Sequence, residues 1–92
     1  MHYVVTHYFL KENVSLEMMA PHLEYLKKLL KQGKLVITGP FTDSERGGMF
    51  ILEVENEEEL TTIVNNDPAI RDGIARSEVR PYKIFLQRQI IN

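Results

Sequence analysis

Apolar residues gather in several short stretches that polar segments separate. A stretch rich in β-branched and aromatic residues is typical of a strand. This pattern recurs along the chain. It predicts four strands, over residues 2–10, 34–41, 49–55 and 78–87. Because successive side chains of a strand point to opposite faces, the first strand should place Tyr3, Val5, His7 and Phe9 on one side.

A helical period lies between the first two predicted strands. Spacings of three and four predict an amphipathic helix whose buried stripe consists of Leu16, Met19, Leu23, Leu26 and Leu30. Pro21 falls within this pattern, and proline costs about 3 kcal/mol in a helix interior but little in the first turn. We therefore expect the helix to begin near Glu17 or Met18, or to bend just before Pro21. Gly33 should end it.

A second helix is predicted over residues 56–66. Asn56 is a good N-cap, and Glu59 three residues later completes a capping box. Asp67 and Pro68 should end this helix, because a residue that precedes proline disfavours the helical region.

The order of the predicted elements is β-α-β-β-α-β, which indicates an α+β domain of ferredoxin-like topology. Right-handed crossovers place both helices on one face of a four-stranded antiparallel sheet. Pro81 cannot donate a hydrogen bond to a neighbouring strand, so the last strand should lie at an edge or pair only after Pro81. The open, partly apolar face of the sheet needs a cover, and a second copy of the chain is the simplest one, which predicts a homodimer.

Composition narrows the class of protein further. The length predicts a single domain over residues 1–92. A net charge of −2 without a dense Lys/Arg block argues against a nucleic-acid partner. The absence of cysteine excludes disulfides and suits a reducing compartment. No apolar run approaches the ~20 residues of a membrane helix, so we expect a soluble, cytoplasmic protein with no membrane partner.

The histidines do not show the spacing of a metal site. His2 and His7 should lie on opposite faces of the first strand, and no HxH, HExxH or cysteine-based pattern is present. We therefore predict no metal and no other cofactor. His7 can point toward the helix layer and His22, where a structural, hydrogen-bonded histidine is the favoured interpretation.

His22 is the strongest candidate for chemistry. It follows Pro21 in the early turns of the first helix, between Met18, Tyr25 and Leu26, at the border of the predicted stripe. The positive end of a helix dipole disfavours a second positive charge, so this position suits the neutral imidazole that a general base requires. The competing interpretation is a half-buried histidine that only bonds a neighbour.

Four short motifs, in this order, carry a resemblance to a known family. They are His22-Leu23 in the first helix, Gly39-Pro40 after the second strand, Asp67-Pro68 after the second helix, and Val79 to Tyr82 before the last strand core. Together with "GGMFILEVENEEEL" and "NNDPAIRDGIA" they cover nearly the whole chain, which resembles the YciI-like (YCII-related) family.

The resemblance implies a ferredoxin-like fold that pairs into a dimeric α+β barrel. It also implies a catalytic pair in a cleft, at His22 and Asp67 of this chain. Some relatives look like lyases or dehydrochlorinases that act without a cofactor on small, often aromatic, rings. Many relatives carry arginine where this chain has Met19. We expect Gly39, Pro40 and Met19 to contact the substrate, and Arg80 or Arg46 to supply the missing positive charge.

The topology allows contact between the two catalytic candidates. Both helices run in the same direction along the sheet, and the axial offset between His22 and Asp67 should be roughly 5–10 Å. Contact through a long side chain or a water is compatible with that offset. Two hypotheses remain open: a small lyase or isomerase that uses this pair, or a non-catalytic dimeric module that binds a small ligand or a partner protein. In the second case Asp67 only terminates a helix.

Overall fold

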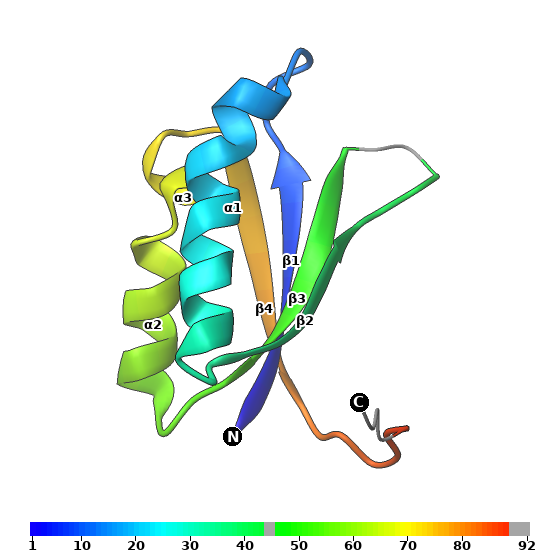
Figure 1. Cartoon of the computed structure of the whole chain (residues 1–92), viewed down its shortest axis with the longest axis vertical. Coiled ribbons are helices and arrows are strands. Elements are labelled where there is room, and N and C mark those ends of the chain that lie inside the picture. The colour runs from blue at the N-terminus through cyan, green and yellow to red at the C-terminus, as the bar shows by residue number, and fades with distance from the viewer. Residues whose placement is uncertain (44–45, 89–92) are drawn as a thin grey trace.

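The computed structural model describes residues 1–43 and 46–88, so Ser44 of the predicted turn lies outside the described part. The elements, in chain order, are β1 (His2–Phe9), α1 (Leu16–Lys31), β2 (Leu35–Pro40), β3 (Gly47–Glu53), α2 (Glu57–Asn65), α3 (Pro68–Arg71) and β4 (Ala75–Tyr82). Figure 1 shows the helices together on one face of the sheet. The predicted α+β topology is confirmed, with the short helix α3 added before the last strand.

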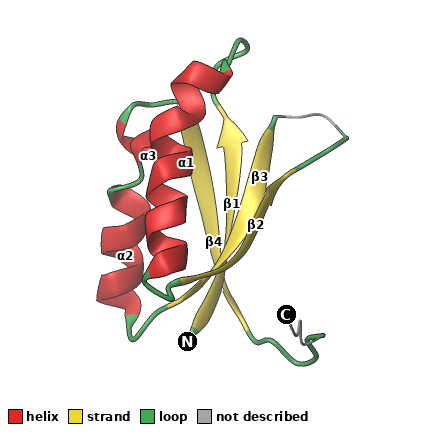
Figure 2. Ribbon diagram, in the orientation of Figure 1, coloured by secondary structure: helices red, strands yellow, loops and turns green. Residues whose placement is uncertain are grey.

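The sheet is antiparallel throughout, in the order β2-β3-β1-β4. Figure 2 shows its twisted strands beside the helix layer. β4 is an edge strand, as Pro81 predicted, and Pro81 lies opposite Tyr3 of β1. An edge position leaves the missing N–H of proline without consequence for the sheet.

The last strand begins and ends earlier than predicted. It covers Ala75–Tyr82 instead of residues 78–87. The chain enters the sheet directly after Gly73, whose φ of 68° turns it sharply. Ala75 then pairs with Phe9 at one end of β1, and Tyr82 pairs with His2 at the other. Residues 83–87 have passed the end of β1, so this neighbour offers them no backbone groups to bind.

The first helix is rotated relative to the predicted stripe. Leu26 and Leu29 are buried, whereas Leu16, Leu23 and Leu30 are 92%, 51% and 57% exposed. Two rows of apolar residues run along α1 and share Leu26. The row that contains Leu29 is buried, whereas the predicted row with Leu16, Leu23 and Leu30 is largely exposed. Burial of the other row was therefore a wrong prediction.

The helix begins at Leu16, one residue before the predicted start. The side chain of the N-cap Ser15 accepts a hydrogen bond of 3.1 Å from the Met18 N–H. Pro21 lies inside the helix and is exposed. It lies in the second turn, where its missing N–H removes one hydrogen bond within the helix.

The hydrophobic core lies between the helices and one face of the sheet. β1 follows the predicted alternation, with Tyr3, Val5 and His7 all facing the helices. The remaining apolar members of the main cluster are Leu26, Leu29, Leu35, Phe50, Leu52, Val54, Leu60, Ile63 and Val64. His7 is thus a polar residue at the edge of an otherwise apolar layer.

Candidate active site

His22 and Asp67 are in direct contact. Nδ1 of His22 lies 2.7 Å from Oδ1 of Asp67, although 45 positions separate the two residues in the sequence. The His22 side chain is 12% exposed, and that of Asp67 is 1% exposed. The two side chains lie closer together than the predicted axial offset of roughly 5–10 Å suggested. Both point into the layer between the helices and the sheet.

Asp67 is held in place by the backbone around it. It is the N-cap of α3, with extended backbone angles of −64° and 125°, as expected for a residue before proline. Its Oδ1 accepts a hydrogen bond of 2.9 Å from the Ala69 N–H. Asp67 therefore separates α2 from α3 and at the same time orients its carboxylate toward His22.

The hydrogen bond assigns the tautomer of His22. An ionised carboxylate only accepts hydrogen bonds, so Nδ1 of His22 carries the proton and donates it to Asp67. In the neutral ring Nε2 then holds a lone pair. No residue in the described ranges bonds Nε2, which leaves it available as a proton acceptor. This is the arrangement in which a carboxylate prepares a histidine for general base catalysis.

His7 is the third polar side chain of the cluster. Its ring centroid is 5.2 Å from that of His22, and its Nε2 is 3.7 Å from Oδ2 of Asp67. The ring meets Phe50 edge-on at 5.0 Å and 81°. Burial lowers the pKa of His7, the Asp67 carboxylate raises it, and His22 lowers it again, so the neutral form is favoured.

The hydrogen bonding of His7 differs from the prediction. His7 faces His22 as expected, but within the described ranges neither of its ring nitrogens has a hydrogen-bond partner. Oδ2 of Asp67 is also without one. The sequence could not indicate this, because the polar neighbours of His7 are His22 of α1 and Asp67 at the start of α3.

A cleft of about 580 Å³ opens beside this cluster, between the first half of α1 and the strands β2 and β3. His7 and His22 line it. Its helix wall is apolar and consists of Leu16, Met19, Ala20, Leu23 and Leu26. None of its described lining residues is Asp, Glu, Lys or Arg. The stripe that was predicted to be buried therefore faces this cleft in part.

The opposite wall comes from β2 and β3. Gly39 and Pro40 of β2 line it together with Gly47 and Gly48 of β3, and contact of Gly39 and Pro40 with a substrate stays a prediction. A Cβ atom on Gly48 would lie 2.6 Å from the carbonyl oxygen of Gly39, so only glycine allows the two strands to approach this closely.

The two arginines considered as anion binders do not line the cleft. Arg80 lies directly opposite Val4, and the residues on either side of it, Val79 and Pro81, lie opposite Val5 and Tyr3. Because Tyr3 and Val5 face the helices, Val4 and Arg80 face away from them. Arg80 therefore points away from this cleft within its own chain, and its contact with a substrate stays a prediction. Arg46 bonds the carbonyl oxygens of Phe9 and Lys11, at 3.4 Å and 3.3 Å.

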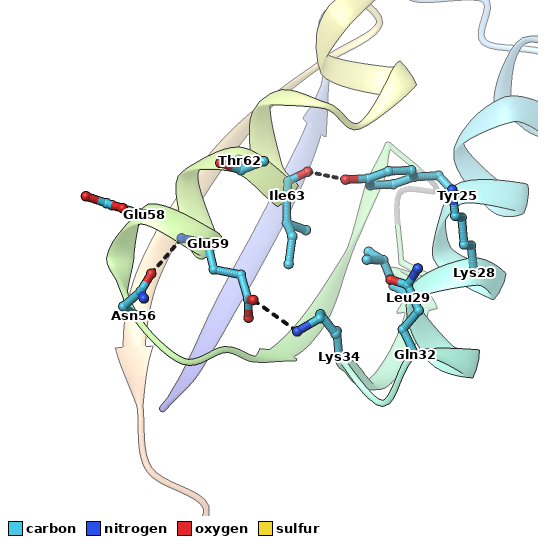
Figure 3. Close-up of a pocket in the computed structure, with 10 residues that line it drawn as sticks. All are labelled: Tyr25, Lys28, Leu29, Gln32, Lys34, Asn56, Glu58, Glu59, Thr62 and Ile63. Carbon is cyan, nitrogen blue, oxygen red and sulfur yellow. Dashed lines mark hydrogen bonds and ion pairs between the residues drawn. The ribbon is translucent and has the colours of Figure 1, made fainter.

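A second pocket, of about 470 Å³, lies between the end of α1 and the start of α2 (Figure 3). Its prominent polar groups are already paired. The Tyr25 hydroxyl donates to the carbonyl of Ile63 at 2.8 Å, and Lys34 Nζ lies 3.0 Å from Oε2 of Glu59. These bonds join α2 to α1 and to the residue that precedes β2, so we interpret the pocket as structural.

Three side chains could hold a metal ion. In the described part of the chain, possible ligand atoms of His7, His22 and Asp67 all lie within 4.8 Å of one another. The sequence showed no such group, because its members come from three elements and not from one short motif.

Among the described residues, no helix is long and apolar enough to cross a membrane.

Comparison with known proteins agrees with this description. The uncharacterised protein YjpA of Bacillus subtilis (strain 168) is 30% identical over 73 residues, which are 79% of this chain and 85% of YjpA. A structure of the dehydrochlorinase TftG from Burkholderia phenoliruptrix AC1100, in complex with 2,5-dihydroxybenzoquinone, is also similar. It matches with a TM-score of 0.70 and 25% identity, over 90% of this chain and 94% of TftG.

A further structure, of the protein YjcS, shares the fold alone, with a TM-score of 0.58 and 17% identity over 91% of this chain and 98% of YjcS. The family model of the YCII-related domain matches residues 1–83. The chain therefore belongs to the YCII-related domain family.

Proposed function

We propose that the protein is a small enzyme that moves a proton on a small ring substrate, as a lyase of the dehydrochlorinase kind or as an isomerase. The observation that carries this proposal is the 2.7 Å contact between His22 and Asp67 at the wall of an apolar cleft. A carboxylate-oriented imidazole beside such a cleft is a typical constellation for proton transfer.

The chemistry needs only these two side chains. Nε2 of His22 accepts a proton from a hydroxyl group or an acidic C–H bond of the ring, and Asp67 stabilises the imidazolium that forms. The electron pair left on the substrate expels a leaving group such as chloride, or moves a double bond. In an elimination the proton passes from His22 to solvent, and in an isomerisation it returns to another substrate atom. Neither route needs a redox partner or a cofactor.

The lining of the cleft favours an uncharged ring. Its described lining offers no cationic side chain to an anionic substrate, and Met19 stands where many relatives carry arginine. A neutral aromatic or quinol ring can pack between the helix wall and the flat glycine-rich wall. The remaining polar lining groups, His7, His22 and Thr38, can bond its hydroxyl groups.

The comparison with TftG supports this assignment. TftG is named a 5-chloro-2-hydroxyhydroquinone dehydrochlorinase, and its structure contains a dihydroxybenzoquinone. A ring of that size with several hydroxyl groups meets the requirements of the cleft described here.

A substrate screen with matched variants tests the proposal. Chlorinated and unchlorinated hydroxyquinols, phenols and small lactones are incubated with the protein, and chloride release and ultraviolet spectra are recorded. We expect His22→Gln to lower the rate on an accepted substrate roughly 10²–10⁴-fold, the usual contribution of a general base. His2→Gln, which removes a partly buried histidine outside the cleft, should retain the wild-type rate. Equal rates for wild type and His22→Gln would contradict the proposal.

A further inference from the structure

Three buried polar atoms beside His22 require an explanation. Within residues 1–43 and 46–88, both ring nitrogens of His7 and Oδ2 of Asp67 have no hydrogen-bond partner. A buried polar atom without a partner costs about 1–3 kcal/mol. Oδ2 and Nε2 of His7 face each other at 3.7 Å, which is too long for a hydrogen bond. A single cation between them would satisfy both.

We propose that His7, His22 and Asp67 form a binding site for one divalent transition-metal ion of the zinc type. Two imidazoles and one carboxylate are a donor set that zinc accepts in sites with an open fourth position. The three residues come from β1, from α1 and from the N-cap of α3, so the tertiary fold assembles the site.

The distances between the donor atoms suit a shared ion. Ligand atoms about 2.0–2.1 Å from zinc lie roughly 3.3 Å apart in a tetrahedral site. Oδ1 of Asp67 lies 2.7 Å from Nδ1 of His22, and Oδ2 of Asp67 lies 3.7 Å from Nε2 of His7, so the two separations lie on either side of this value. One ligand atom from each of the three residues lies within 4.8 Å of the others, so side-chain shifts on the order of 1 Å would complete the coordination.

The surroundings of the cluster support the ligands from behind. The Ala69 N–H binds Oδ1 of Asp67 and leaves Oδ2 directed toward His7, while the edge-on contact with Phe50 orients the His7 ring. In the described part of the chain, the charged partners of Asp67 are the two histidines, so no lysine or arginine occupies the place of an ion. The cleft, which both histidines line, provides the entry path and the open position.

Metal binding and the proposed proton transfer exclude each other. A neutral His22 can coordinate through Nδ1 only after its proton has moved to Nε2, and Nε2 is then no longer a base. Zinc should therefore inhibit the enzyme. The metal site itself does not depend on the proposed function, since it can be measured without a substrate.

Cobalt and zinc titrations test the site. Untagged protein is stripped with EDTA, dialysed and titrated with Co²⁺, with the visible absorption of the bound ion as the signal, and Zn²⁺ is then added as a competitor. We expect one ion per chain. Asp67→Asn and His7→Phe should weaken binding roughly a hundredfold or more, since loss of a ligand should exceed the loss of a supporting contact. The control His2→Gln removes a histidine that lies 3.9 Å from Glu53 on the surface, and it should bind as the wild type does.

The inference is overturned by any of three results: no saturable binding to wild type at micromolar ion, wild-type affinity in His7→Phe, or loss of binding in His2→Gln. If circular dichroism shows that His7→Phe does not fold, His22→Gln decides in its place, and wild-type affinity there has the same meaning. Turnover by the EDTA-treated protein is measured separately. If that turnover is absent while Co²⁺ still binds, the proposed function fails and the metal site stands.

Discussion

At the scale of single residues, Asp67 connects two parts of the site. Its Oδ1 accepts hydrogen bonds from His22 and from the Ala69 backbone, so one carboxylate fixes both the base and the start of α3. In the proposed mechanism His22 and Asp67 serve one proton transfer, so the losses caused by His22→Gln and Asp67→Asn should be far from additive. We expect the double variant to be about as slow as His22→Gln alone.

Steady-state kinetics of the four proteins on one accepted substrate measure this coupling. The comparison is valid only if Asp67→Asn retains the wild-type circular dichroism spectrum. A double variant whose loss equals the product of the two single losses would show that the residues act independently.

Met19 is a residue at which the contribution of the cleft's helix wall to stability can be measured. It lies on the helix wall of the cleft and is only half-buried. A long charged side chain can extend from such a border into water, so Met19→Arg should change the free energy of unfolding by less than about 1 kcal/mol. Urea denaturation measures this change. A loss beyond about 3 kcal/mol would show that Met19 belongs to the core.

Some residues of the site could be predicted from the sequence and others could not. Alternation on β1 correctly placed His7 on the helix face, and family motifs correctly paired His22 with Asp67. The orientation of Arg80 was within reach, because the register with Val4 decides it, but the register depends on where β4 begins. That Oδ2 of Asp67 lacks a hydrogen-bond partner among the described residues could not be predicted, because it depends on distances among three elements.

At the scale of elements, the rotation of α1 decides which leucines stabilise the fold. Leu26 is 5% exposed, so Leu26→Ala should lower the free energy of unfolding by about 2–5 kcal/mol. Leu23 is 51% exposed and should cost far less, within about 1 kcal/mol, when replaced by alanine. Chemical denaturation of both variants checks the rotation. Equal losses in the free energy of unfolding would show that Leu23 is buried, as the sequence pattern predicted.

The ion pair between Lys34, which precedes β2, and Glu59 of α2 should make stability depend on pH. The hydrogen bond from Lys34, and then that from the Glu55 N–H, hold the pKa of Glu59 below its usual value of 4.5. A lowered carboxyl pKa stabilises the fold above the usual value, and this contribution is lost as the pH falls through the folded-state pKa. Lys34→Met should therefore destabilise the protein at pH 7 and progressively less below about pH 4.5.

Thermal unfolding of wild type and Lys34→Met from pH 7 to pH 3 measures this dependence. Lys27→Met is the matched control for the loss of one positive charge, because Lys27 pairs with Glu24 on the exposed side of α1 at 3.4 Å. A difference between wild type and Lys34→Met that stays constant with pH would contradict the assignment.

The predicted helices show what periodicity can and cannot decide. The Asn56 cap of α2 was predictable because it is local: the Glu59 N–H donates to Asn56 Oδ1. The other half of the predicted capping box differs, because Oε1 of Glu59 accepts from the Glu55 N–H, one residue before the N-cap. The buried side of α1 was not, because several apolar rows have the same spacing. Only the packing partner selects among such rows, and the sequence of the helix does not contain that partner.

At the scale of the whole molecule, the helices cover only one face of the sheet (Figure 1). The other face carries Val4, Ile51 and Ile37 as direct cross-strand neighbours, and Ile37 is 56% exposed. We expect a second copy to cover this face and form a homodimer. Sedimentation at micromolar concentration should give twice the chain mass of 10.7 kDa, and Ile37→Lys should shift the mass toward the monomer. A clean wild-type monomer would rule this dimer out.

The boundaries of the sheet show the limit of local sequence patterns at this scale. Residues 83–87 have the composition of a strand, but the first residue of β1, His2, lies opposite Tyr82. No part of β1 therefore lies beside residues 83–87. Conversely, Ala75 and Arg76 look unlike a strand and join the sheet because Phe9 and Tyr8 lie beside them. Pairing partners, and not composition, set where β4 begins and ends.

The two walls of the cleft differ in how freely evolution can alter them. Gly48 cannot accept a side chain without displacing the backbone of β2, so the flat wall should remain nearly constant while the fold persists. On the helix wall Leu26 is buried in the core, but Leu16, Met19 and Leu23 are not. Substrate preference can therefore diverge by replacements on α1 alone, at little cost to folding. A change at Met19 would be such a step.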